Sequence, residues 1–290
     1  MAHVHGTRCC ASGSKFCALQ KQGRHGNRKV SVRRSLRLVR TRATAADEMY
    51  GFELERSTNF EEIWSPKDQD DGSGKEKVVG VVGFGSLLSE RSALSTFSTV
   101  HNFRMGRVKN YRRIFAHAGP FFLECGIADV ATRELASLSV EEGSSQDSIV
   151  VSLFDIHVDD IPAFIAREEE YRFMAVEPEE MDGSPCKRSH VICCASTDEA
   201  FIKINGQERY DKRYGPHGIS KIWDNTLLPC PIYLRHCILA AKNLGPEAYD
   251  SFLDYTFLAD RQTSIRSHLE GRPDILTSLP PPHLRERYGG

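Results

Sequence analysis

The feature that most constrains the fold of this chain is a short apolar run, VVGVV (78–82), that ends in the sequence Gly83-Phe84-Gly85-Ser86. A continuous apolar run of this length, rich in β-branched residues, is typical of a strand that is buried on both faces. Glycines directly after such a strand allow a tight turn, and they also let backbone N–H groups approach a small anionic group. We therefore expect a buried strand, a glycine turn and then a helix that is capped by Ser89 and reaches about Phe97.

The segments after the glycine turn predict an α+β protein. We expect strands over residues 103–117 (with a bend at Gly106), 121–131, 148–156, 175–178 and 188–195, and helices over 159–170, 231–243, 247–258 and 263–270. Residues 141–147 form a polar loop or hairpin turn, and 181–189 and 203–229 are loop-rich. This order lacks the regular alternation of a doubly wound fold. We expect a mixed β-barrel with surrounding helices and extra C-terminal helices.

Composition divides the 290-residue chain into four parts. Residues 1–46 contain eleven Lys and Arg and no Asp or Glu, and they are rich in Ser, Ala and Thr. This composition is typical of an organelle transit peptide, for a chloroplast in preference to a mitochondrion, and the alternative is a basic arm with a partner of its own. Residues 47–77 are expected to be an acidic disordered linker, 78–275 the folded domain with an insertion at 177–229, and 276–290 a disordered tail.

Charge and cysteine content exclude several classes of function. Without residues 1–46 the chain has 27 basic and 39 acidic residues, so we expect no nucleic-acid partner. No apolar segment approaches the roughly 20 residues that cross a bilayer, and we expect no membrane span. The six cysteines after residue 46 show no Cys-x-x-Cys pair, so we expect no metal site and interpret them as small buried side chains. The oligomeric state is left open.

The glycine turn does not fit three familiar motifs. A dinucleotide-binding fingerprint needs Gly-x-Gly-x-x-Gly, and its third glycine position falls on Leu88. A P-loop ends in Gly-Lys followed by Ser or Thr, and there is no lysine between Gly80 and Ser92. A nucleophile elbow needs Gly-x-Ser-x-Gly, whereas two leucines follow Ser86. Spacing alone explains the glycines equally well by a tight strand-to-helix turn and by ligand binding.

Three segments resemble the γ-glutamylcyclotransferase-like family and occur in that family's order. Gly83-Phe84-Gly85-Ser86-Leu87 resembles its Gly-Tyr-Gly-Ser-Leu signature, with phenylalanine in place of tyrosine. Residues 108–115 (VKNYRRIF) look like its Val-x-Gly-Tyr-Arg-x-x-Phe strand, with Asn110 in place of a glycine, and asparagine accepts a positive φ. Arg167-Glu168-x-x-Tyr171 resembles the helix end that carries the family's catalytic glutamate, with one residue fewer before the tyrosine. Residues 233–261 look like the longer plant and algal members.

The resemblance implies an enzyme that cyclises a γ-glutamyl amine or peptide, such as a glutathione-related compound, to 5-oxoproline and the free amine or amino acid. It implies a small-molecule substrate and no metal or organic cofactor. It makes Glu168 the catalytic acid and base, with Glu169 or Glu170 as substitutes. The substrate-binding residues that it implies are Gly83, Phe84, Gly85, Ser86, Leu87 and Tyr171.

Other interpretations of the same residues stay open. A catalytically silent member of the fold could use the pocket to bind a ligand or a partner, and the long insertion and Phe84 favour this alternative. An enzyme that hydrolyses the amide and releases glutamate is a third possibility. The run Arg167–Glu170 could be an ordinary solvated charge run at a helix end. Arg112 and Arg113 could both be ordinary strand residues, or one of them could line the pocket.

Overall fold

The computed structural model describes residues 78–289; the predicted transit peptide (1–46) and linker (47–77) lie outside the described residues. Its elements, in chain order, are β1 (Val78–Gly83), η3 (Ser86–Leu88), α3 (Glu90–Leu94), β2 (His101–Lys109), β3 (Tyr111–Ala118), α4 (Pro120–Glu124), η4 (Val130–Thr132), β4 (Glu134–Glu142), β5 (Ser148–His157), η5 (Val158–Asp160), α5 (Ile161–Arg167), β6 (Arg172–Val176), β7 (His190–Cys194), α6 (Asp198–Asn205), α7 (Gln207–Tyr214), η6 (Gly215–His217), β8 (Leu228–Pro229), α8 (Pro231–Leu244), α9 (Pro246–Asp254), β9 (Thr256–Leu258), α10 (Ile265–Gly271), η7 (Pro273–Thr277), η8 (Pro282–Leu284) and α11 (Arg285–Tyr288). Within this range, every helix is too short or too polar to cross a membrane.

The strands form two mixed sheets, which confirms the expected α+β class. One sheet has five strands in the order β2-β5-β1-β7-β6, and the other has four in the order β8-β4-β3-β9. β1 is the central strand of the first sheet, antiparallel to β5 and parallel to β7. The two sheets face each other as an open half-barrel, so the described strands do not close into one hydrogen-bonded barrel.

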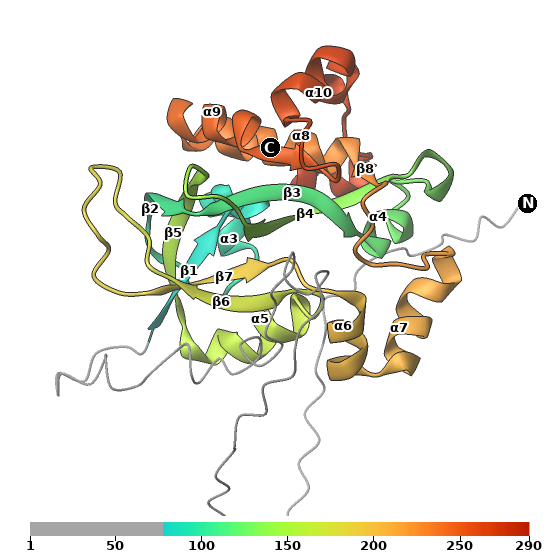
Figure 1. Cartoon of the computed structure of the whole chain (residues 1–290), viewed down its shortest axis with the longest axis horizontal. Coiled ribbons are helices and arrows are strands. Elements are labelled where there is room, and N and C mark those ends of the chain that lie inside the picture. Colours follow the sequence, from blue (N-terminus) through green and yellow to red (C-terminus); the bar gives the residue numbers. More distant parts are fainter. Residues whose placement is uncertain (1–77, 290) are drawn as a thin grey trace, which may run out of the picture. The chain divides into compact units, whose positions relative to one another are not determined.

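Three apolar layers hold the sheets and helices together. The layer between the sheets joins Val82, Leu153 and Ile192 of the five-stranded sheet to Val140 of β4. The opposite face of the five-stranded sheet is covered by α3 and α5, and α8, α9 and α10 pack against the four-stranded sheet. Figure 1 shows the orange and red helices above β3 and β4, with α5 below β6 and β7. β1 is therefore buried on both faces, as its apolar run predicts.

The predicted strand over 103–117 is two strands in different sheets. The chain turns at Asn110, whose φ is +64°, and not at Gly106. The N–H of Asn110 donates to the carbonyl of Asp147 at 2.8 Å, which ties this turn to the hairpin between β4 and β5. Gly106 has a different purpose, because a Cβ there would lie 2.3 Å from the Leu153 side chain. The turn is thus set by Asn110.

The predicted strand over 121–131 is wrong. Pro120 begins a short helix, α4, and the chain turns at Gly126 with a φ of +67°. Pro at the first position of a helix and glycine in the left-handed region are both normal helix boundary signals. The strand that pairs with β3 is instead β4, over residues that the sequence pattern left unassigned.

The insertion and the C-terminal tail are more ordered than the sequence suggests. Residues 198–214 form α6 and α7, which pack Phe201 and Tyr214 into a small core of their own. The tail was expected to be disordered from residue 276, but it carries η8 and α11. Leu284 and Tyr288 are buried against Phe122 of α4. The tail is therefore part of the packed domain.

Candidate active site

The glycine loop lies at the end of β1, in the gap between the sheets. Gly83 is the last residue of β1, and Gly85 precedes the 3-10 turn η3. A Cβ on Gly83 would lie 2.3 Å from Ser152 Oγ and 2.6 Å from the Leu87 carbonyl oxygen, so only glycine fits. The hydroxyl of Ser152 donates to that same carbonyl at 2.7 Å, which fastens the loop to β5. The loop is thus compact, and β5 fixes its position through Ser152.

Three backbone N–H groups of the loop are available to a ligand. The carbonyls of Gly85 and Ser86 accept hydrogen bonds from Leu88 and Ser89, as in a normal 3-10 turn. The N–H groups of Gly85, Ser86 and Leu87 donate to no acceptor within residues 78–289. Ser86 and Leu87 are half-buried, and Gly85 is buried. Successive N–H groups of this kind can hold a carboxylate or a developing oxyanion.

A buried arginine holds the loop in position. Arg113, in the middle of β3, is fully buried, and its Nε donates to the Phe84 carbonyl at 2.7 Å. The rest of its guanidinium donates to the carbonyls of Val150 and Ser251, and it lies over the ring of Phe252. Burial lowers the pKa of Arg113 to about 9, so the group is still charged at neutral pH. Because the Phe84 carbonyl is fixed toward Arg113, the arginine sets the orientation of the peptide that begins the loop.

Arg113 thus lies behind the loop, where it contacts the Phe84 carbonyl and no described carboxylate. Its neighbour Arg112 points the other way and pairs with Glu141 at 2.7 Å.

The three glutamates after α5 have different surroundings. Glu168 is the C-cap of α5; 18% of its side chain is exposed, and it pairs with Nε of Arg167 at 3.0 Å. Glu169 pairs with Arg209 at 2.9 Å and Glu170 with Arg213 at 2.5 Å. Both arginines belong to α7, so the insertion binds the two substitute candidates. The interpretation as a solvated charge run is therefore wrong.

Glu168 has the electrostatic character of an acid–base group. Burial raises the pKa of the Glu168 carboxyl, Arg167 opposes that rise and Glu170 adds to it. A carboxyl whose pKa is raised above its ordinary value is a stronger base, and it can take up a proton and give it back during a reaction. The local fold explains the burial, because α5 ends at Arg167 and the N–H of Tyr171 closes a turn onto the Glu168 carbonyl at 3.0 Å.

Tyr171 connects this turn to the interior of the half-barrel. Its hydroxyl donates to the Leu138 carbonyl on β4 at 2.9 Å and lies 3.1 Å from Nδ1 of His117. Burial, and then the charges of Glu168 and Glu170, raise the pKa of Tyr171. Leu138 is also the neighbour of the glycine loop, since a Cβ on Gly85 would lie 3.0 Å from Leu138 Cδ2. The predicted residues Tyr171 and Gly85 therefore meet at the same leucine.

Two aromatic residues that the sequence did not single out complete this region. His117 stacks on Trp223 of the insertion, with ring centroids 4.9 Å apart, and packs edge-on against Tyr171. Because the Tyr171 hydroxyl gives its proton to Leu138, Nδ1 of His117 is the donor in their contact. Burial lowers the pKa of His117 to about 4, which keeps it neutral. Its Nε2 and the Trp223 Nε1 are buried without a partner among residues 78–289.

No signal in the sequence could have identified His117 or Trp223. Neither lies in a motif, and the contact between them joins residues 106 positions apart through an isolated β-bridge.

The comparisons with known proteins find likeness only at the level of structure. A scan against protein-family models and a search of curated proteins give no match. A structure described as a γ-glutamyl cyclotransferase is 9% identical, with a TM-score of 0.34, over 47% of this chain and 85% of its own. An uncharacterised protein from Homo sapiens is 11% identical, with a TM-score of 0.34, over 47% of this chain and 86% of its own. A protein from Arabidopsis thaliana is 10% identical, with a TM-score of 0.30, over 49% of this chain and 91% of its own. Likeness at this level carries no inference about activity, which is argued below from the side chains.

Proposed function

We propose that this protein is an enzyme that cyclises a γ-glutamyl amine or γ-glutamyl peptide to 5-oxoproline. The observation that carries the proposal is the neighbourhood of two features. The first feature is the Glu168 carboxyl, which is mostly buried, has a raised pKa and lies one turn before Tyr171. The second is the glycine loop: the Tyr171 hydroxyl donates to the Leu138 carbonyl, and the Leu138 side chain lies against Gly85. A proton acceptor and a set of free N–H groups are the two requirements of this reaction.

The reaction needs one proton carrier. The α-ammonium of the substrate gives a proton to the Glu168 carboxylate, and the resulting amine attacks the γ-carbonyl carbon of the same molecule. The ring nitrogen, which is positively charged after the attack, gives up its second proton as the C–N bond of the tetrahedral intermediate breaks. The departing amine takes the first proton from the Glu168 carboxyl and is released as an ammonium ion once it has also taken up the second. General acid–base catalysis of this kind contributes roughly 10²- to 10⁴-fold. Protons and bonds balance without any further reactant.

The glycine loop stabilises the charge that develops during the attack. The N–H groups of Gly85, Ser86 and Leu87 follow one another directly after β1, at the start of η3, and the Ser86 hydroxyl is a further donor. Loss of one such donor in an acyl-transfer enzyme costs about 10²- to 10³-fold in rate. The attack is intramolecular, so the loop must also hold the glutamyl chain in its folded conformer.

Product analysis of the full-length chain tests the proposal. The protein is incubated with γ-glutamyl dipeptides, γ-glutamylamines and glutathione, and both 5-oxoproline and free glutamate are quantified by mass spectrometry. We expect 5-oxoproline, and a loss of about 10²-fold or more in Glu168→Gln. Glu169→Gln is the matched control, because its side chain pairs with α7, and we expect it to keep most activity. Free glutamate as the product would instead establish the hydrolase.

The alternative function is a silent binding protein, and one observation favours it. Trp223 and Arg213 bring the insertion against His117 and Glu170, beside the candidate catalytic glutamate. A segment in this place can narrow access for a substrate. If no compound is turned over by a folded protein, and γ-glutamyl compounds still bind, the silent binder replaces the enzyme.

We also propose that residues 1–46 direct the protein to a chloroplast, with a mitochondrion as the alternative. The basis is their basic composition without acidic residues. Fusion of residues 1–77 to a fluorescent protein in plant or algal cells tests this, and a diffuse cytosolic signal would contradict it.

A further inference from the structure

A cavity lies toward the other end of β1 from the glycine loop. It has a volume of about 340 Å³, at the lower end of the range for small-molecule sites. Its lining residues come from β2, β5, β7 and the loop before β7: Asn102, Phe103, Arg104, Asp155, Glu180, Lys187, Arg188 and His190. Asp155 pairs with Gly80, three residues before Gly83, which places the cavity about 10 Å along the strand from the loop. The cavity is therefore separate from the candidate active site.

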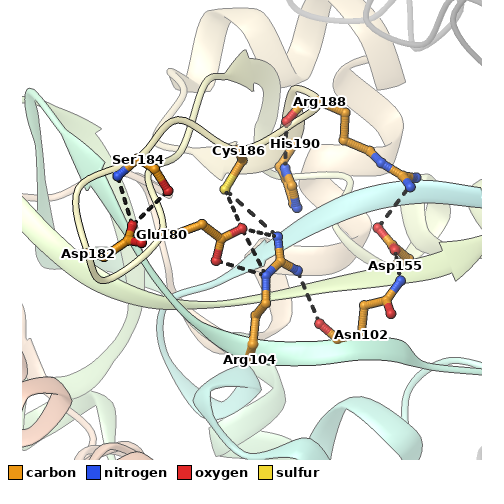
Figure 2. Close-up of polar contacts among 9 residues, drawn as sticks. All are labelled: Asn102, Arg104, Asp155, Glu180, Asp182, Ser184, Cys186, Arg188 and His190. Carbon is orange, nitrogen blue, oxygen red and sulfur yellow. Dashed lines mark hydrogen bonds and ion pairs between the residues drawn. The ribbon is translucent and has the colours of Figure 1, made fainter.

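The charged groups in one wall of the cavity are paired with each other. Arg104 binds Glu180 through two nitrogens, at 3.1 and 2.9 Å, and donates to the Asn102 carbonyl at 3.1 Å. The Cys186 thiol donates to the same glutamate at 3.3 Å. Figure 2 shows these contacts pinning the loop that carries Glu180 and Cys186 onto β2. These charges neutralise each other, so this wall defines shape and adds no net charge.

The floor of the cavity contains a buried carboxylate with an incomplete set of partners. Only 5% of the Asp155 side chain is exposed. Its Oδ2 accepts a hydrogen bond from the Asn102 amide at 2.6 Å. Its Oδ1 lies 3.6 Å from Arg188 Nη1, which is too long for a hydrogen bond. A buried carboxylate with one neutral donor and one loose ionic contact can accept a further charged donor.

A second acceptor beside Asp155, Nε2 of His190, has no partner among residues 78–289. His190 is 2% exposed, and its ring packs over Gly80, where a Cβ would lie only 2.7 Å from the ring. Its Nδ1 lies 3.1 Å from the Arg188 carbonyl, so Nδ1 carries the proton and Nε2 carries a lone pair. Burial lowers the pKa of His190, which keeps the ring neutral. Within the described chain Nε2 accepts no hydrogen bond, and in Figure 2 it points toward the Arg104 guanidinium.

The rim of the cavity carries the opposite charge. Lys187 is exposed and pairs with no acidic residue in 78–289, and 44% of the Arg188 side chain is exposed. The lining therefore has an acceptor-rich floor, at Asp155 and His190, and a cationic rim, at Lys187 and Arg188. No group of His, Cys, Asp or Glu among the described residues is arranged to hold a metal ion.

We propose that this cavity is a binding site for a free amino acid, or for an equally small zwitterion. The ammonium group donates to Asp155 Oδ1 and His190 Nε2, and the carboxylate lies between Lys187 and Arg188. The site contains no group placed to react with such a ligand, so its role is recognition. The inference does not depend on the proposed function.

Calorimetric titration of the full-length chain with glycine, L-leucine, L-glutamate and L-lysine tests the proposal. Acetate and methylammonium serve as probes of the two halves of the ligand. We expect at least one amino acid to bind at millimolar or lower Kd, and each half-ligand to bind at least about ten-fold more weakly. Equal binding of acetate would make the cavity a simple anion site and overturn the proposal. Absence of binding by every amino acid up to about 10 mM would also overturn it.

Variants locate the ligand in this cavity. Asp155→Asn should weaken binding by about ten-fold or more. Since a buried substitution can disturb folding, the exposed double variant Lys187→Gln/Arg188→Gln provides a second test, with an expected loss of about three- to ten-fold. Lys221→Gln, an exposed lysine outside the cavity, is the matched control. Glu168→Gln should bind the amino acid unchanged; if that variant alone abolishes binding, the ligand occupies the candidate active site and the proposal is wrong.

Discussion

Replacement of Arg113 by methionine is the most informative perturbation of this fold. The substitution keeps an unbranched side chain of similar length and removes three charged hydrogen bonds at once. These bonds go to the carbonyls of Phe84, Val150 and Ser251, which belong to three different parts of the chain. Arg113 is fully buried, so water cannot reach these carbonyls without a change in the packing.

The size of the effect follows from these contacts. Each buried acceptor that loses its donor costs roughly 1–3 kcal/mol, so three acceptors would cost about 3–9 kcal/mol. Removal of the buried charge offsets part of this, since the lowered pKa of Arg113 shows that burial disfavours the cation. We expect the free energy of unfolding to fall by about 3–5 kcal/mol, as when a buried charge network loses one member. Arg113→Lys should recover only part, because an ammonium cannot reach three separate carbonyls.

Urea unfolding of the full-length chain, followed by circular dichroism, measures this difference. Arg112→Met is the matched control on the same strand. Arg112 is half-buried and pairs with the buried Glu141, and Glu141 keeps Arg261 as a second partner at 3.1 Å. The control should lose less than about 1 kcal/mol. If Arg113→Met also loses less than about 1 kcal/mol, the three carbonyls find other donors and Arg113 does not hold the glycine loop.

Three further predictions test other parts of the structure. Gly83→Ala should lose about 1–3 kcal/mol in urea unfolding, because its Cβ meets Ser152 Oγ and the Leu87 carbonyl, whereas Gly215→Ala, which meets nothing within 4 Å, should not. The folded-state pKa of Glu168 lies above its ordinary 4.5, so ionisation of Glu168 destabilises the fold as the pH rises above 4.5. Glu168→Gln should therefore melt at a higher temperature than the wild type at neutral pH. A higher melting temperature only below pH 4.5 would contradict the raised pKa. Tyr288→Ala should lose about 2–4 kcal/mol, a loss that a disordered tail would not show, with the exposed Arg285→Ala as its control.

Local sequence signals determined several elements of this protein. The β-branched run defined β1, and Ser89 caps α3 by accepting a hydrogen bond from Ser92 N–H at 3.4 Å. The polar run before β5 predicted the hairpin that the structure has at 143–147. These features depend on residues close in sequence, whose hydrogen bonds and backbone preferences are readable from the chain itself.

Tertiary contacts decided the rest of the fold. Asn110 and Gly106 are both plausible turn residues, and only the pairing of β2 with β5 and β3 with β4 selects Asn110. The tail carries few apolar residues, and its order comes from Leu284 and Tyr288 packing on a cluster formed by α4 and Cys230. Sequence pattern alone does not reveal such distant partners, because apolar periodicity reports which side of an element is buried and not what covers it.

The candidate site divides in the same way. The sequence, through its resemblance to a family, identified the glycine loop, Glu168 and Tyr171, and their roles stay predictions until activity is measured. The three-dimensional fold separated Glu168 from Glu169 and Glu170, because α7 of the insertion supplies arginines to the latter two only. It also placed Arg113 behind the loop and left Nε2 of His117 and of His190 without a partner in the described part of the chain. The charge state and partners of a buried group depend on everything packed around it, and that is fixed only when distant segments meet.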